Sequence, residues 1–173
     1  MLHQLHPDLS LDGSLGGIDA SVLPLPAEGQ VTLEGLEAIT RRLACSPVRW
    51  ASLVRHDPEA RWYTRLVRTD AIEVWALGWW PGQGTPVHDH GGALGALTVV
   101  GGTLAEDVYD IDWQPEGRRH LSVGTTATFA TDHVHAVSAV GSVPATSIHA
   151  YSPPALPLRY TPAGDLVASG VLP

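Results

Sequence analysis

The fold is decided by the stretch Gly82-Gln83-Gly84-Thr85-Pro86-Val87-His88-Asp89-His90. Side chains of an extended segment alternate between two faces, so His88 and His90 point to the same side. The glycines and the proline before them predict a tight turn that leads into a strand. Two imidazoles on one face at the start of a strand suit a metal ion. The pair alone is weak evidence, and the alternative is that both histidines only line a polar barrel mouth.

Length and composition predict one globular domain. The chain has 173 residues, of which 44% are hydrophobic and 16% charged, enough to bury a sizeable core. Its ten basic residues are all arginine and its acids number 18, giving a net charge of −8. This acidic balance argues against nucleic acid and anionic membranes as partners. A single cysteine, Cys45, excludes an internal disulfide, and the first residues do not read as a secretory signal, so we expect a cytoplasmic protein.

The sequence pattern predicts a helical part followed by a β-rich part. We expect residues 1–31 to form a loosely ordered arm and residues 32–56 a helical segment. Thr32 predicts a helix cap, and apolar residues at spacings near 3.6 follow it until Pro47. A second short helix is expected from Val48 to about Arg55. Residues 61–154 read as a β-barrel and residues 155–173 as a C-terminal tail, all within one domain, 1–173.

The β-rich part contains short runs separated by Gly, Pro, Asp and Thr. Their number and spacing predict an all-β-dominated fold, a small antiparallel barrel or jelly roll preceded by about two helices. The eight expected strands are Trp62–Arg68, Ile72–Trp80, Ala96–Val100, Thr103–Tyr109, His120–Val123, Ala127–Ala130, Ala136–Val140 and Ala145–Tyr151.

A metal bound by His88 and His90 needs at least one further ligand, and His120, His133 and His135 are the candidates downstream. Spacing favours His135. The two sequence motifs of the cupin superfamily place a glycine six residues before the first histidine, as Gly82 stands here, and another eleven residues before the last, as Gly124 stands. The chain therefore resembles a cupin. We expect His133 to lie behind the ligands or on the surface.

The motifs also depart from the cupin pattern. Gly95 stands where cupins commonly have a glutamate ligand, and the second motif is degenerate at Ala130, Asp132 and Ala139. Three neutral imidazoles would then hold the metal and leave coordination positions open. Such a site keeps the full charge of the metal and favours an anionic ligand such as a thiolate.

Five fragments in order make the chain similar to the thiol dioxygenases, and to the cysteine dioxygenase family in particular, from about Trp50 to Pro154. They are Tyr63-Thr64-Arg65, His88-Asp89-His90, the block from Gly101-Gly102-Thr103-Leu104 to Glu106, His135-Ala136-Val137, and Ser147-Ile148-His149-Ala150-Tyr151-Ser152-Pro153-Pro154.

The resemblance implies that His88, His90 and His135 bind Fe(II), although imidazoles also accept nickel, zinc or copper. Cysteine would chelate the iron through its thiolate and amine. The resemblance also implies that Arg65 clamps the substrate carboxylate, for which a guanidinium offers a matched fork. The alternative for Arg65 is an ordinary surface arginine of a strand. Tyr63 would share its face and contact the substrate, or pack as an ordinary aromatic residue.

Ser147, His149 and Tyr151 alternate on one expected strand and share a face. They resemble the family's Ser-His-Tyr series, in which the tyrosine hydroxyl reaches towards the substrate while His149 and Ser147 hold it in place. The alternative is an ordinary half-polar strand. Some members carry a cysteine at the position of Gly95, linked to the tyrosine. Glycine cannot form that link, so Tyr151 would act as an unmodified phenol, as in the bacterial branch of the family.

The leading expectation is a mononuclear non-haem iron dioxygenase that oxidises L-cysteine with O₂ to cysteine sulfinate. One alternative is an oxygenase of another small thiol, similar to 3-mercaptopropionate, or one that gives a different cysteine-derived product. Another is a metal-binding cupin without catalysis. Expected partners are a small thiol and O₂, with no nucleic acid and no membrane, and the resemblance favours a monomer.

Overall fold

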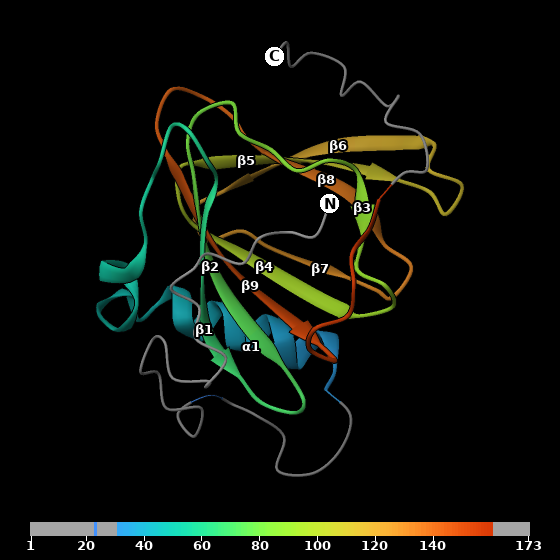
Figure 1. Cartoon of the computed structure of the whole chain (residues 1–173), viewed down its shortest axis with the longest axis horizontal. Helices are drawn as coiled ribbons and strands as arrows, with labels where there is room; N and C mark the ends of the chain where they lie inside the picture. Colours follow the sequence, from blue (N-terminus) through green and yellow to red (C-terminus); the bar gives the residue numbers. More distant parts are fainter. Residues whose placement is uncertain (1–22, 24–30, 161–173) are drawn as a thin grey trace.

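The computed structural model describes residue 23 and residues 31–160, and it is dominated by antiparallel strands (Figure 1). One α-helix and two 3₁₀ turns precede them. The elements are α1 Leu33–Ala44, η2 Pro47–Arg49, η3 Ala51–Leu53, β1 Trp62–Arg68, β2 Glu73–Trp79, β3 His88–Asp89, β4 Leu94–Gly101, β5 Thr103–Tyr109, β6 Pro115–Ser122, β7 Thr126–Phe129, β8 Val134–Ala139, β9 Ala145–Ser152 and β10 Arg159–Tyr160.

The strands form two five-stranded sheets that face each other as the walls of a small barrel. One sheet has the order β1-β2-β9-β4-β7 and the other β10-β3-β8-β5-β6, with every neighbouring pair antiparallel. Helix α1 lies across the first sheet, against β4, β9 and β7, on the side away from the second sheet (Figure 1). The fold expected from the sequence, an antiparallel β-barrel with helices before it, is confirmed.

Side chains alternate between the two faces of the first sheet, so the strands contribute to two separate hydrophobic cores. Val74 and Ile148 point outward from the first sheet and pack in one cluster with Leu36 and Ile39 of α1. Leu97 of β4 points inward and packs in a second cluster between the sheets. Burial on both faces explains why β4 reads as a near-continuous apolar run rather than an alternating one. β9 is buried along most of its length as well, although it carries polar residues.

Helix α1 begins where the sequence places it, because the Thr32 hydroxyl accepts a hydrogen bond from the Gly35 amide at 3.2 Å. The expected second helix is instead the pair of 3₁₀ turns η2 and η3. Trp50 separates them with φ of −142°, outside the helical range. Its buried indole donates a hydrogen bond of 2.8 Å to the Leu43 carbonyl. The backbone at Trp50 therefore leaves the helical conformation where this side chain is anchored in the core.

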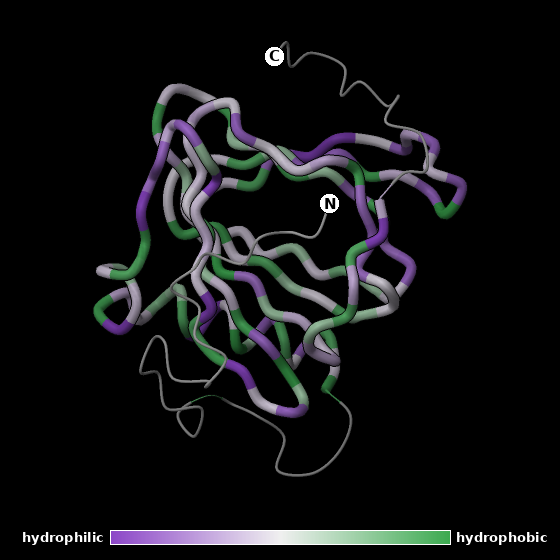
Figure 2. The backbone as a smooth tube through the Cα atoms, in the orientation of Figure 1, coloured by the Kyte–Doolittle hydropathy of each residue, from purple (hydrophilic) through white to green (hydrophobic). Residues whose placement is uncertain are grey.

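All eight expected strands are present, with ends that shift by a few residues, and two short strands were missed. β3 carries His88, and β10 pairs with it from the segment expected to be a tail. β6 is the outermost strand of its sheet, hydrophilic along most of its length (Figure 2) and exposed at every residue except Leu121. Within the described residues, no helix has the length and apolar character that spanning a membrane requires.

Candidate metal centre

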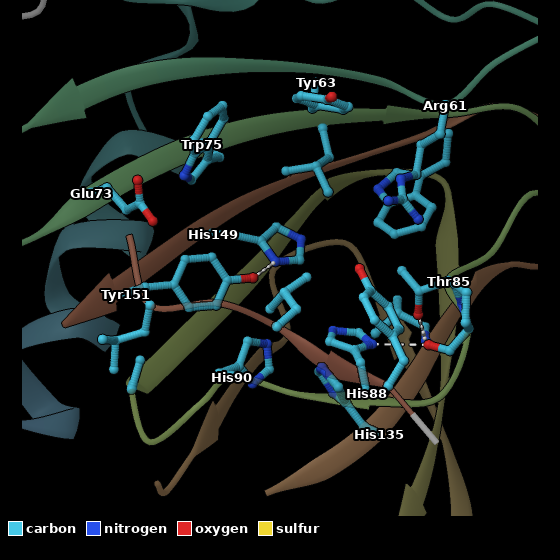
Figure 3. Close-up of a pocket in the computed structure, with 18 of the residues that line it drawn as sticks. Arg61, Tyr63, Glu73, Trp75, Thr85, His88, His90, His135, His149 and Tyr151 are labelled. Atoms are coloured by element: carbon cyan, nitrogen blue, oxygen red, sulfur yellow. Dashed lines mark hydrogen bonds between the residues drawn. The ribbon is translucent and has the colours of Figure 1, made fainter. Parts of the chain in front are cut away.

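A cavity of about 260 Å³ lies between the two sheets and collects most of the predicted site residues (Figure 3). His88 and His135 come from the second sheet and His90 follows β3, whereas Tyr63, His149 and Tyr151 come from the first sheet. Ser147 lies behind His149 rather than on the cavity wall, and Arg65 is not among the lining residues. His120 is exposed on β6, away from this cluster.

The three histidines predicted as ligands converge at one point. His88 and His135 are directly paired across β3 and β8, and the ring centroids of the three imidazoles lie 4.8–5.1 Å from one another. Each offers one ring nitrogen to a group whose atoms all lie within 4.8 Å. All three side chains are buried, with 2–5% of each residue exposed.

Hydrogen bonds fix the tautomers of two of these imidazoles. His88 donates from Nδ1 to the Pro86 carbonyl at 2.9 Å, and His135 donates from Nδ1 to a Glu106 oxygen at 2.8 Å. A carbonyl or a carboxylate only accepts, so Nδ1 carries the proton in both rings. Each Nε2 therefore keeps a free lone pair, which is what a metal requires of a neutral imidazole.

His90 supplies the clearest sign of a missing partner. Neither of its ring nitrogens has a hydrogen bond, although both are buried. Its ring is held instead by stacking on Phe129, at 5.0 Å and 12° between planes. An unsatisfied buried nitrogen costs about 1–3 kcal/mol, and a metal ion bound here would satisfy one of the two. The donor set and its burial fit a metal ion.

Burial also keeps the ligand histidines neutral. It lowers the pKa of His88 to about 3, with the neighbouring His135 acting in the same direction. Burial likewise lowers the pKa of His90 and of His135 below the ordinary value. Three neutral imidazoles at neutral pH are ready to donate lone pairs to a cation.

A second cluster, which the sequence did not predict, stands behind His135. Glu106 of β5 is fully buried, and one of its oxygens accepts hydrogen bonds from His135 Nδ1 and, at 2.9 Å, from His133 Nε2. The other oxygen accepts from Arg119 Nε at 2.6 Å. Burial alone would raise the pKa of Glu106, but these three hydrogen bonds lower it below its ordinary value. His133 thus lies behind the ligands, as expected.

Glu106, His133 and His135 also have the composition of a metal group. Their short contacts are, however, hydrogen bonds between donors and an ionised acceptor, and Arg119 occupies the remaining carboxylate oxygen. The three-histidine group in the cavity is therefore the better candidate for holding a cation, and Glu106 holds His135 by a hydrogen bond.

Ser147, His149 and Tyr151 form the hydrogen-bonded series expected from the sequence, called the relay below. Ser147 Oγ lies 2.8 Å from His149 Nε2, and His149 Nδ1 lies 3.1 Å from the Tyr151 hydroxyl. Trp79 extends the relay, since its indole N–H donates to Ser147 Oγ at 2.9 Å.

The contacts of Ser147 favour one direction for the hydrogen bonds of the relay. Ser147 already accepts from Trp79, and among the contacts of the described residues the acceptor for its own proton is His149 Nε2. His149 then donates from Nδ1 to the Tyr151 oxygen, which leaves the phenol proton directed away from the relay. Burial lowers the pKa of His149 to about 3 and raises the pKa of Tyr151. Both groups are therefore neutral at neutral pH.

The arginine that lines the cavity is Arg61, immediately before β1, and not Arg65. Arg65 pairs across the sheet with Trp75, and its guanidinium lies 5.4 Å from the centroid of that ring. Trp75 itself lines the cavity (Figure 3). Arg61, Tyr63 and Arg65 share one face of the chain, so alternation alone could not separate the two arginines.

The segment after β9 closes the cavity from one side. Arg159 makes a two-point ion pair with Asp89, with Nε–Oδ1 at 2.9 Å and Nη2–Oδ2 at 2.8 Å. This pair fastens β10 to β3 beside the metal ligands and brings Tyr160 to the cavity wall. Nothing in the sequence pattern linked these residues.

Gly95 lies directly opposite Tyr151 across β4 and β9, so a cysteine there would adjoin the phenol. In this chain the Phe129 ring fills the space that a side chain would need, and a Cβ at Gly95 would overlap it. The structure therefore agrees with an unmodified Tyr151.

Replacing Gly95 with alanine is expected to lower the free energy of unfolding by about 1–3 kcal/mol, because Phe129 must move in a packed core. Gly101→Ala on the same strand is the control, since its Cβ would meet Thr146 at an ordinary 3.9 Å. That change is expected to be neutral or to stabilise by about 0.4–1 kcal/mol. Denaturant unfolding measures both, and equal effects would contradict the role given to Phe129.

Comparison with known proteins agrees with this geometry. The family model for cysteine dioxygenase type I matches residues 14–160. Cysteine dioxygenase type 1 of Rattus norvegicus and that of Mus musculus are each 26% identical to this chain over 140 residues, covering 74% of it and 68% of the relative.

Solved structures resemble the fold at lower identity. A conserved protein with a double-stranded β-helix domain from Klebsiella pneumoniae has a TM-score of 0.55 at 19% identity, covering 63% of this chain and 90% of that one. A cupin superfamily protein from Desulfitobacterium hafniense has a TM-score of 0.51 at 12% identity, covering 59% and 85%. With the family model covering most of its length, the chain belongs to the cysteine dioxygenase type I family and has a cupin fold.

Proposed function

We propose that this protein is a mononuclear non-haem iron dioxygenase that oxidises L-cysteine with dioxygen to cysteine sulfinate. The observation that carries the proposal is the convergence of three buried, neutral imidazoles on one cavity that also holds the Tyr151 hydroxyl. Membership of the family supports the reaction class. A chain of this composition, with the single cysteine Cys45, suits a reducing cytoplasm, and we expect a monomer.

His88, His90 and His135 would hold ferrous iron through ring nitrogens. When bound, the iron supplies the redox chemistry by which both oxygen atoms of dioxygen join the thiol sulfur. The ligands carry no charge, so the site favours an anionic donor from the substrate, and a cysteine thiolate is such a donor.

Tyr151 would bind and orient the substrate through its hydroxyl. Burial keeps the phenol protonated, and His149 already donates to its oxygen, so the remaining O–H is available to an acceptor in the cavity. Trp79 and Ser147 hold His149 in the tautomer that this arrangement requires. The relay thus acts by positioning one proton donor.

The cavity wall would keep water away from the reacting groups. Trp75, Leu77 and Trp79 line it from β2, and Leu156 and Leu158 line it from the segment after β9. An apolar wall strengthens every polar contact within it and limits side reactions of the thiol.

The test is oxygen uptake by the iron-loaded protein with L-cysteine, 3-mercaptopropionate and cysteamine in parallel, with mass analysis of the products. We expect uptake with cysteine and a product heavier by two oxygen atoms. The zinc-loaded protein is the control, because zinc has no redox chemistry.

The other outcomes discriminate between the alternatives. Uptake confined to 3-mercaptopropionate, or a product of a different mass, would replace cysteine sulfinate formation by another thiol oxidation. No uptake with any thiol would contradict the dioxygenase and favour a metal-binding cupin without catalysis.

A further inference from the structure

Arg61 is a partly buried cation that lines the cavity. Among the residues that the structure describes, no carboxylate lies within 4.0 Å of its guanidinium. One terminal nitrogen donates to the Gly84 carbonyl at 3.2 Å, and the guanidinium lies 5.1 Å from the centroid of the Trp79 ring. Its Nε is buried with no hydrogen-bond partner.

This state is costly unless an anion completes it. Removing a guanidinium from water costs several kcal/mol, and one carbonyl and one aromatic face do not replace a counter-charge. Burial lowers the pKa of Arg61, but arginine remains protonated at neutral pH. The open donors of the guanidinium and the cavity therefore form a site for an anion, and the planar fork matches a carboxylate.

Arg65, by contrast, already has its contact outside the cavity. Its guanidinium is stacked on Trp75, whose ring forms part of the wall. The two arginines are four residues apart, about 13 Å along an extended chain, and Arg61 lines the cavity whereas Arg65 does not. Figure 3 shows Arg61 and Thr85 on one side of the cavity and Glu73 and Tyr151 on the other.

We propose that Arg61, and not Arg65, binds the carboxylate of the substrate in this protein, with Trp75 holding Arg65 away from the cavity. The inference rests on the proposed thiol dioxygenase function and names the residue that recognises the carboxylate of the substrate. The end of the cavity at Glu73 is left to the neutral or cationic part of the ligand, since an anion there would meet a carboxylate.

The test compares Arg61→Gln with the matched control Arg65→Gln, using cysteine and cysteamine, which differ by the carboxylate. Anaerobic calorimetric titration of the iron-loaded protein measures binding without turnover. We expect Arg61→Gln to weaken cysteine binding by at least about 30-fold, the usual effect of removing one partner of a buried charge pair. Cysteamine binding should change less than about twofold, as should both ligands with Arg65→Gln.

Arg61→Lys is a second variant that keeps the charge in the same space. An ammonium lacks the two-nitrogen fork, so we expect an intermediate loss confined to cysteine. The inference is overturned if Arg65→Gln gives the selective loss, if Arg61 variants affect both ligands equally, or if cysteine does not bind to the unaltered protein.

The experiments distinguish a failure of the carboxylate site from a failure of the proposed dioxygenase function. Selective loss of cysteine binding in Arg61→Gln, without oxygen uptake in the unaltered protein, would support the carboxylate site and contradict the dioxygenase. Oxygen uptake with cysteine that Arg61→Gln leaves at its original KM would support the dioxygenase and contradict the site.

Discussion

Replacing His88 with alanine is expected to remove both bound iron and thiol-dependent oxygen uptake. With His88 gone, two imidazoles remain, and neither Asp89 nor Glu106 can take its place. Asp89 is held by Arg159 in a two-point ion pair, and Glu106 is held by three donors behind His135. We expect iron to fall from about one atom per chain to a small fraction of that, because metal affinity depends steeply on ligand count. Elemental analysis after dialysis and an oxygen electrode measure the two losses.

His120→Ala is the matched control, since His120 is exposed on β6 and away from the cavity. It should keep iron and activity within experimental scatter. A His88→Ala protein that folds, retains stoichiometric iron and consumes oxygen with cysteine would contradict the metal centre described above.

The three-histidine group was predictable because it depends on local alternation and fixed spacing. His88 and His90 share a face by the period of a strand, and His135 follows Gly124 at the distance set by one β-turn and one strand. The structure joins these segments by pairing His88 with His135. By contrast, strands β3 and β10 have only two residues each, which is too short for an alternating pattern to show in the sequence.

The sequence alone does not reveal which of Arg61 and Arg65 lines the cavity. Residues i, i+2 and i+4 of a strand present one face, so both arginines satisfied the same pattern and the resemblance favoured Arg65. What separates them is Trp75 on the neighbouring strand, a contact that depends on the register of β1 against β2.

The position of Glu106 in its strand carries a signal of its own. Glu106 stands two residues after Leu104 in β5, so it shares the buried face of that leucine. A carboxylate on such a face is seldom tolerated without strong partners. Its partners Arg119 and His135 come from the neighbouring strands β6 and β8, and His133 comes from the residue before β8, so only the tertiary structure brings them together.

Replacing Glu106 with glutamine is expected to weaken iron binding and turnover by about 10–100-fold, the usual effect of removing a group that orients a metal-bound histidine. The carboxylate accepts at both oxygens, from two histidines on one side and Arg119 on the other. A glutamine amide has one oxygen and one NH₂ group, so its NH₂ group must face either Arg119 or the two histidines. On that side two N–H donors then face each other without an acceptor. If His135 responds by protonating Nε2 instead of Nδ1, its ligand lone pair is lost.

Asp107→Asn is the control for this variant, because Asp107 is the next carboxylate along β5 and makes only a 3.6 Å, partly exposed ion pair with Arg118. It should leave iron affinity unchanged. Competition with a chelator measures affinity, and ¹⁵N chemical shifts of His135 in the zinc-loaded protein report its tautomer. A loss of stability in Glu106→Gln with unchanged affinity and an unchanged tautomer would show that Glu106 only packs. A shifted tautomer together with weaker iron binding would show that the carboxylate positions His135 for the metal.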